Sequence, residues 1–220
     1  MQRLSTVGVV LGLALTAGCM TVGTPRAGEP LRLEADDVLV FGKLRVLEGG
    51  RSVVPMPELI DELLWPGEPV TFKVSLFGIE SERKALYPPY ENDGTFWWVV
   101  PRGTYLMFHT PPGPGVYNAV LAAFQTPVDA DCTYLGTLTV HIDTQAGRAN
   151  GVEYVVQDVE VSDEFDTPRR DLARRHPGLA RPPVEALMFT DEELTNMLSA
   201  WSRDRCDLIL SRHGLRAFDR

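Results

Sequence analysis

Apolar and polar residues alternate along much of the chain between residues 38 and 161, as they do in strands that bury one face. Segment 70–76 shows this most clearly, because valine, phenylalanine and leucine occupy every second position. Similar runs, separated by turns rich in glycine and proline, occur at residues 38–46, 52–54, 85–87, 95–100, 104–108, 120–125, 132–143 and 152–161. No long helical pattern interrupts them. The sequence therefore predicts a mainly β domain over residues 37–166, folded as an antiparallel β-sandwich.

One stretch in the middle of the chain is especially rich in β-branched and aromatic residues. Thr95–Val100 and Thr104–Phe108 predict two strands, and Pro101-Arg102-Gly103 predicts the short turn that joins them as a hairpin. Bulky side chains occupy both odd and even positions of the first strand, so we expect it to be covered on both faces. Trp97 and Trp98 face opposite sides. They are expected either in the core or, as an alternative, on a surface that binds a sugar or peptide.

Helical periodicity belongs to the C-terminal part of the chain. A short helix is predicted over Thr167–Arg175. A longer helix of about 20 residues is predicted from Thr190, because Thr190 and Glu193 form a capping box and apolar residues up to Leu208 follow on one stripe. We expect this α-helix to pack on the sandwich and residues 167–220 to form a helical C-terminal appendage.

The first residues have the features of a secretory signal peptide. Arg3 is the only charged residue before an uncharged run from Leu4 to Thr16. That run is too short to cross a bilayer, which needs about 20 apolar residues. Small residues then lead directly to Cys19. Residues 1–18 are therefore predicted to be a signal peptide that is removed.

The sequence Leu15-Thr16-Ala17-Gly18-Cys19 resembles the lipobox of bacterial lipoproteins, with leucine one position earlier than usual. The resemblance implies that Cys19 becomes the first mature residue and carries palmitate and other acyl chains, which together hold a protein firmly on a membrane. Met20 in place of aspartate implies sorting to the outer membrane of the bacterial cell, facing the periplasm. Residues 19–36 are expected to be a lipid-anchored tether, because Thr21–Pro30 is rich in glycine and proline.

A second resemblance lies around the predicted pair of central strands. The pattern D-G-x-F-x4-P-x-G-x-Y is formed by Asp93, Gly94, Phe96, Pro101, Gly103 and Tyr105. It is similar to the transthyretin-like (prealbumin-like) β-sandwich, the group that includes carboxypeptidase regulatory-like domains, and the likeness covers about residues 38–110. Arg102 between the proline and the glycine departs from that pattern. The resemblance implies an accessory domain that serves as a spacer, an assembly surface or a weak binder, with no catalytic residue in the motif.

Charge and cysteine content limit the expected partners. The chain has a formal net charge of −9, which becomes more negative when Arg3 is removed, so no nucleic acid partner is expected. Cys132 and Cys206 remain once Cys19 is acylated. In an oxidising compartment they form either a disulfide that links the C-terminal helix to the sandwich or two buried reduced thiols.

A cluster of arginines follows an acidic run near residue 160. These arginines are Arg169, Arg170, Arg174 and Arg175. One interpretation is a basic surface that binds anionic headgroups or an acidic partner. The other is a solvated helix whose arginines pair with the preceding acidic residues, each exposed pair contributing about 0–1 kcal/mol. The four histidines have no metal-ligand spacing, and no cofactor-binding motif occurs, so neither a metal nor a cofactor is expected.

These observations favour a protein that is not an enzyme. The first hypothesis is a membrane-anchored periplasmic lipoprotein that acts as a structural or binding module of the cell envelope, with an unknown envelope protein or glycan as its partner. A small envelope hydrolase or cell-wall enzyme is the first alternative, and it requires His109 or His141 in a cleft with two carboxylates. A surface carbohydrate binder is the second, and it requires Trp97 or Trp98 to be exposed.

Overall fold

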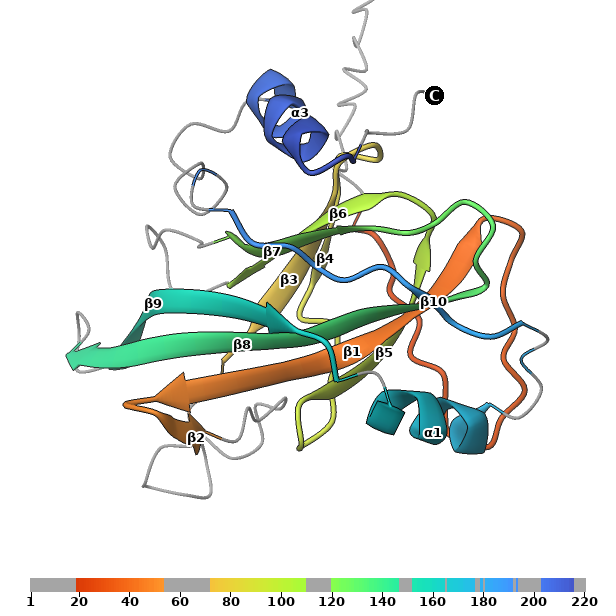
Figure 1. Ribbon diagram of the computed structural model, residues 1–220, viewed down its shortest axis with the longest axis horizontal. Coiled ribbons are helices and arrows are strands. Elements are labelled where there is room, and N and C mark those ends of the chain that lie inside the picture. The colour runs from red at the N-terminus through yellow and green to blue at the C-terminus, as the bar shows by residue number, and fades with distance from the viewer. Residues whose placement is uncertain are drawn as a thin grey trace, which may run out of the picture.

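The computed structural model describes residues 19–53, 72–109, 120–146, 152–164, 166–176, 179, 181–191, 193 and 203–215. The fold is mainly β (Figure 1). The strands are β1 (Asp37–Glu48), β2 (Arg51–Val53), β3 (Val74–Gly78), β4 (Arg83–Leu86), β5 (Thr95–Pro101), β6 (Thr104–His109), β7 (Val120–Gln125), β8 (Cys132–Ala146), β9 (Val152–Ser162) and β10 (Val184–Glu185). The helices are α1 (Asp166–Arg175) and α3 (Arg203–Arg212). The predicted signal peptide lies outside the described residues.

The strands form two sheets. In the first, sheet A, the long strands β1 and β8 are parallel and lie at the centre. Strands β5 and β2 pair with successive parts of the free side of β1, and β10 and β9 pair with successive parts of β8. The second, sheet B, has the order β4-β3-β6-β7 and is antiparallel throughout. Two sheets rich in antiparallel pairs are compatible with the predicted β-sandwich.

The main core is built from the facing sides of both sheets. On β1 the side chains of Val38, Val40, Leu44 and Val46 enter this core, as their alternation in the sequence predicts. Sheet B contributes apolar side chains from every strand, including Leu76 from β3. Full burial of one aliphatic or aromatic side chain stabilises a fold by about 1.5–3 kcal/mol. The apolar stripes of the strands therefore hold the two sheets together.

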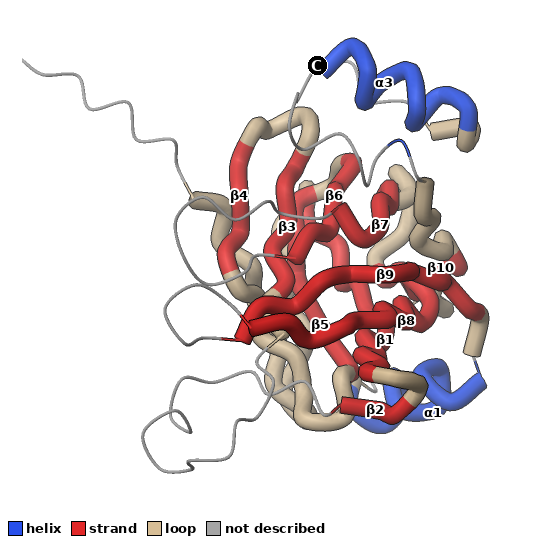
Figure 2. The backbone as a smooth tube through the Cα atoms, turned by 90° about the vertical axis from the view of Figure 1, so that its left-hand side faces the viewer, coloured by secondary structure: helices blue, strands red, loops and turns tan. Residues whose placement is uncertain are grey.

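Each sheet is also covered on its outer side. Helix α3 lies over sheet B and helix α1 over sheet A (Figures 1 and 2). Ile209 and Leu210 of α3 are fully buried against the outer side of sheet B. Leu208, which the sequence placed on the buried stripe, is 55% exposed, so that part of the prediction is wrong. The preceding part of the predicted helix, residues 194–202, lies outside the described residues.

Strands β5 and β6 are both present and joined by a short connection, but they do not pair with each other, so the predicted hairpin is wrong. Strand β5 pairs with β1 in sheet A, whereas β6 pairs with β3 and β7 in sheet B. The chain changes sheets at Pro101–Gly103, and the Tyr105 hydroxyl donates a hydrogen bond to the Pro101 carbonyl at this corner. The break in the strand pattern therefore marks a passage between layers.

Two glycines allow close approach of the backbone at the centre of sheet A. Gly94 has φ +85°, and its carbonyl accepts a hydrogen bond from the Leu44 amide at 2.9 Å. Gly136 has φ +90° at the point where β8 has one more residue than β1. This bulge lets Leu135 and Leu138 both face the main core.

Candidate functional site

The chain that follows Cys19 is packed against the domain. Cys19 is exposed, but the next residue, Met20, is only 7% exposed and belongs to the main core. The Met20 amide donates a hydrogen bond of 2.8 Å to the Lys84 carbonyl on the edge strand β4. Val22 also packs on the main core. The segment predicted to be a tether, residues 19–36, therefore begins within the fold.

The same segment then crosses the outer side of sheet A. Gly23 pairs with Val99 of β5 through two backbone hydrogen bonds of 3.0 and 2.7 Å. Further on, the Gly28 amide donates to the Arg175 carbonyl at the end of α1, and Leu31 packs beneath that helix. The segment is therefore held on the domain by backbone hydrogen bonds, although it is rich in glycine and proline.

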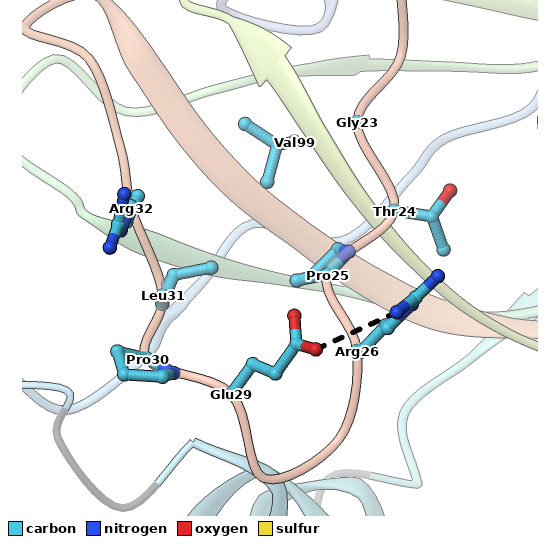
Figure 3. Close-up of a pocket in the computed structure, with 9 residues that line it drawn as sticks. All are labelled: Gly23, Thr24, Pro25, Arg26, Glu29, Pro30, Leu31, Arg32 and Val99. Atoms are coloured by element: carbon cyan, nitrogen blue, oxygen red, sulfur yellow. Dashed lines mark ion pairs between the residues drawn. The ribbon is translucent and has the colours of Figure 1, made fainter.

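A hollow of about 520 Å³ lies between this segment and β5 (Figure 3). Val99 and Leu31 supply apolar lining, and Arg26 and Glu29 form an ion pair of 3.8 Å across the loop. Both charged side chains are mostly exposed, so solvent screens the pair. These two charges cancel, and Arg32, which also lines the hollow, leaves it with one net positive charge. One solvent-screened charge makes the hollow a weak candidate for binding a charged small molecule.

Beneath α1 lies a cluster of aromatic and polar side chains centred on Trp97. The Trp97 ring stacks on Phe41 with 5.0 Å between centroids, and the Arg175 guanidinium lies 4.9 Å from its centroid on the cation–π face. Arg175 also forms an ion pair with Glu91. The buried His176 approaches the Trp97 ring edge-on at 6.2 Å. The cluster fixes the end of α1 on sheet A.

Several polar atoms in this cluster have no hydrogen-bond partner within the described part of the chain. They are the indole nitrogen of Trp97 and both ring nitrogens of His176, which the Glu29 backbone approaches without forming a well-aligned hydrogen bond. Burial lowers the pKa of His176 below its ordinary value, with the Glu29 backbone acting in the opposite direction. The imidazole is therefore held in its neutral form at neutral pH.

Cys132 has the properties of a structural thiol. It is 1% exposed, is not in a disulfide, and packs under α1. Burial, and then the charge of Asp131, raise its pKa to about 12, so the nucleophilic thiolate is disfavoured. His141 lies nine residues further along the same strand, which is roughly 30 Å at about 3.3 Å per residue, too far to act as its base.

The two cysteines considered for a disulfide belong to different parts of the fold. Cys132 faces the outer side of sheet A, whereas α3, which carries Cys206, packs through Ile209 and Leu210 on sheet B. The side chain of Cys206 lies outside the described residues. Cys132 is a free cysteine in this structure.

The other three histidines lie on different segments of the chain, each with its own contacts. Buried His109 stacks on Phe72, with 4.2 Å between ring centroids, and its Nδ1 lies 2.9 Å from the Lys73 carbonyl. His141 pairs with Glu160 at 3.0 Å on the ribbon of β8 and β9. His213 pairs with Asp191 at 2.9 Å after α3. None of these contacts places His109 or His141 in a cleft with two carboxylates.

Most of the side chains predicted to bind a partner are buried or make contacts within the domain. Trp97 is 2% exposed and Trp98 is 1% exposed, so both faces of β5 are covered as expected and neither tryptophan can serve as a surface platform. Arg175 points inward to Trp97, and Arg174 pairs with Asp171. Arg170 is exposed, while the side chain of Arg169 lies outside the described residues.

A feature that the sequence analysis missed lies next to Cys19 on sheet B. Lys73, Lys84, Leu86 and Tyr87 form a group that we call the β4 patch. Leu86 is 53% exposed and Tyr87 is 47% exposed, and the Lys73 ammonium lies 5.3 Å from the Tyr87 ring centroid. Lys84 projects over Phe108 at 5.7 Å. Tyr87 has φ +54°, which is uncommon for a residue with a side chain.

Comparison with known proteins gives no further indication of function. No known protein family matches the chain, and no similar curated protein or solved structure was found. Within the described ranges, no helix is long and apolar enough to span a membrane. The same ranges contain no group of three or more His, Cys, Asp or Glu side chains placed to hold a metal ion.

Proposed function

We propose that this chain is a lipid-anchored protein of the bacterial cell envelope that acts as a non-catalytic structural or binding module. Cys19, at the lipobox-like sequence, is its anchor, and the domain faces the periplasm from the outer membrane. The observation that carries the proposal is the combination of an exposed Cys19 with a buried Met20. The cysteine is accessible to acyl chains while the domain begins at the very next residue.

The chemistry of the described residues supports a non-catalytic role over an envelope hydrolase. The best candidate nucleophile, Cys132, has a raised pKa and lies roughly 30 Å from His141 along β8. His109 and His176, the buried histidines, have pKa values lowered by burial and pack against aromatic rings. A neutral, enclosed imidazole with no nucleophile beside it serves packing better than proton transfer.

A transthyretin-like fold is the finer part of the proposal. Its support is the Asp93-Gly94 turn before β5 and the corner at which Tyr105 bonds the Pro101 carbonyl. These are the positions at which the motif in the sequence places a turn and a corner tyrosine. Domains of this kind act as spacers or binding modules, so the partner is an envelope protein or a glycan. A carbohydrate platform at Trp97 or Trp98 is disfavoured because both are buried.

Acylation of Cys19 tests the proposal directly. The full-length chain is expressed in a Gram-negative host with an alkyne analogue of palmitate, and membrane and soluble fractions are separated. The wild-type protein is expected to be labelled and to remain with the membrane, because several acyl chains on one cysteine anchor durably. Cys19→Ser is expected to lose both the label and the membrane association.

Cys206→Ser is the matched control, since it makes the same substitution elsewhere in the chain, and it should keep both the label and the membrane association. Label that persists in Cys19→Ser would refute the anchor. Separation of inner and outer membranes on a density gradient then tests the outer-membrane assignment.

A further inference from the structure

We propose that the β4 patch lies against the bilayer that holds the acyl chains of Cys19, so that the domain sits on the membrane with this edge of sheet B downward. The inference rests on the proposed acylation of Cys19. It assigns a membrane-contacting surface, with phospholipid headgroups as its ligand, to a side of the domain that is otherwise only an exposed sheet edge.

The proposed anchor residue, Cys19, is directly followed by the first buried residue of the domain. Met20 is buried and its amide donates a hydrogen bond to the Lys84 carbonyl, so Cys19 is held beside β4. The Cα step from Cys19 to Met20 is about 3.8 Å, the hydrogen-bonded backbones of Met20 and Lys84 lie about 5 Å apart, and the two residues from Lys84 to Leu86 span about 7 Å. Leu86 therefore lies within roughly 16 Å of Cys19. Whatever surface holds the lipid is therefore within reach of the β4 patch.

The side chains of the β4 patch suit the headgroup region of a bilayer. Leu86 and Tyr87 are both about half exposed, and an aromatic ring with a polar end suits the headgroup region of a bilayer. Lys73 and Lys84 supply positive charge beside them, with the Lys73 ammonium over the Tyr87 ring and the Lys84 ammonium over the Phe108 ring. Exposed apolar groups ringed by cations are typical of surfaces that bind anionic lipid.

Most of the lysines of the chain lie near this edge of sheet B. The chain carries a formal net charge of −9, yet lysine occurs only at positions 43, 73 and 84. Two of these three lysines therefore lie in the β4 patch, with Glu82 as the exposed acid nearest in sequence. The acidic chain as a whole is repelled by an anionic membrane, whereas Lys73 and Lys84 attract such a membrane at the edge that the proposed anchor already holds near it. The charge thus favours the same orientation as the anchor.

Lysine footprinting tests this orientation with an internal control. The purified acylated full-length protein is placed in vesicles of phosphatidylethanolamine and phosphatidylglycerol and treated with a water-soluble N-hydroxysuccinimide ester. Acylation rates of each lysine are read by mass spectrometry and compared with those of Cys19→Ser protein mixed with the same vesicles. Lys73 and Lys84 are expected to react several-fold more slowly in the anchored protein. Lys43, on sheet A and paired with Asp93, should react equally in both.

Variants separate lipid contact from other causes of protection. Leu86→Ser combined with Tyr87→Ser is expected to restore much of the reactivity of Lys84, whereas Val128→Ser, at a residue 64% exposed on a different loop, should not. Equal reactivity of Lys73 and Lys84 in anchored and free protein, with an acyl mass present on Cys19, would overturn the orientation and leave the anchor standing. Absence of the acyl mass would overturn both. Protection that grows with protein concentration at constant lipid would assign the patch to a second copy of the chain.

Discussion

At the scale of single residues, Gly94 is the position where a side chain is least tolerable. A Cβ atom there would lie 1.9 Å from the Leu44 carbonyl oxygen, and the residue has φ +85°. Gly94→Ala is therefore expected to lower the free energy of unfolding by about 2–4 kcal/mol, measured by urea denaturation of the mature protein.

Gly49 provides a control for the backbone strain alone. It has φ +54°, but nothing lies within 4 Å of an added Cβ. Gly49→Ala should therefore cost only about 1 kcal/mol. Equal losses for the two variants would show that the close approach of Gly94 to β1 contributes nothing.

His109 gives the fold a dependence on pH. Burial lowers its pKa from 6.5 to about 4, so between these values the unfolded chain binds a proton that the folded chain does not. Stability from this site is present above pH 6.5 and is lost as the pH falls toward 4, by up to about 3 kcal/mol. The urea midpoint is expected to fall over this range, since His176 acts in the same direction.

Replacing His109 with phenylalanine removes the titrating group at this site and keeps an aromatic ring there. His109→Phe keeps a ring to stack on Phe72 and should flatten part of this acid-side decline. His141→Gln, at a partly exposed histidine, should leave the wild-type decline nearly unchanged. A His109→Phe profile that runs parallel to the wild type from pH 7 to pH 4 would assign the decline to other groups.

At the scale of elements, α3 contains neighbouring leucines with opposite environments. Leu210 is fully buried against sheet B and Leu208 is 55% exposed. Leu210→Ala is expected to destabilise the fold by about 2–5 kcal/mol, and Leu208→Ala by less than about 0.5 kcal/mol. Thermal denaturation of the two variants measures the difference. A small loss for Leu210→Ala would mean that α3 is not part of the cooperative fold.

The sequence predicted the strands better than their partners. The alternation along β1 and the bulky run of β5 depend on neighbouring residues, and the structure confirms both strands. The change of sheet at Pro101–Gly103 could not be predicted from the same pattern, because a break between strands is compatible with either a hairpin or a passage between layers. The parallel pairing of β1 with β8 joins residues 39 and 132, and alternation does not specify distant partners.

The α3 stripe shows a different limit of sequence reasoning. Helical periodicity alone selected Leu208 as a buried residue, but the helix presents Ile209 and Leu210 to sheet B. The phase of a short apolar stripe is uncertain by one residue when the helix start is set only by a capping pattern. The direction in which a helix faces is fixed by the surface it covers.

At the scale of the whole molecule, the candidate site combines local and distant information. Cys19 is proposed as the anchor from the short sequence before it alone, because a processing signal of this kind is local in sequence. The β4 patch could not, since it depends on a hydrogen bond between Met20 and Lys84, 64 residues apart. Composition placed the segment after Cys19 in a tether, but Met20, Val22 and Leu31 supply enough apolar surface to fix it on the domain.

The central position of the parallel pair β1–β8 has a consequence for how the chain folds. The pairing of Leu39 with Cys132 closes a loop of more than ninety residues, and the entropy of closing it must be lost before the pair stabilises the fold. A chain that has emerged only as far as β7 leaves one side of β1 without its partner. Folding is therefore expected to be slow and to complete late, and the export that we propose would then act on a chain that is still unfolded.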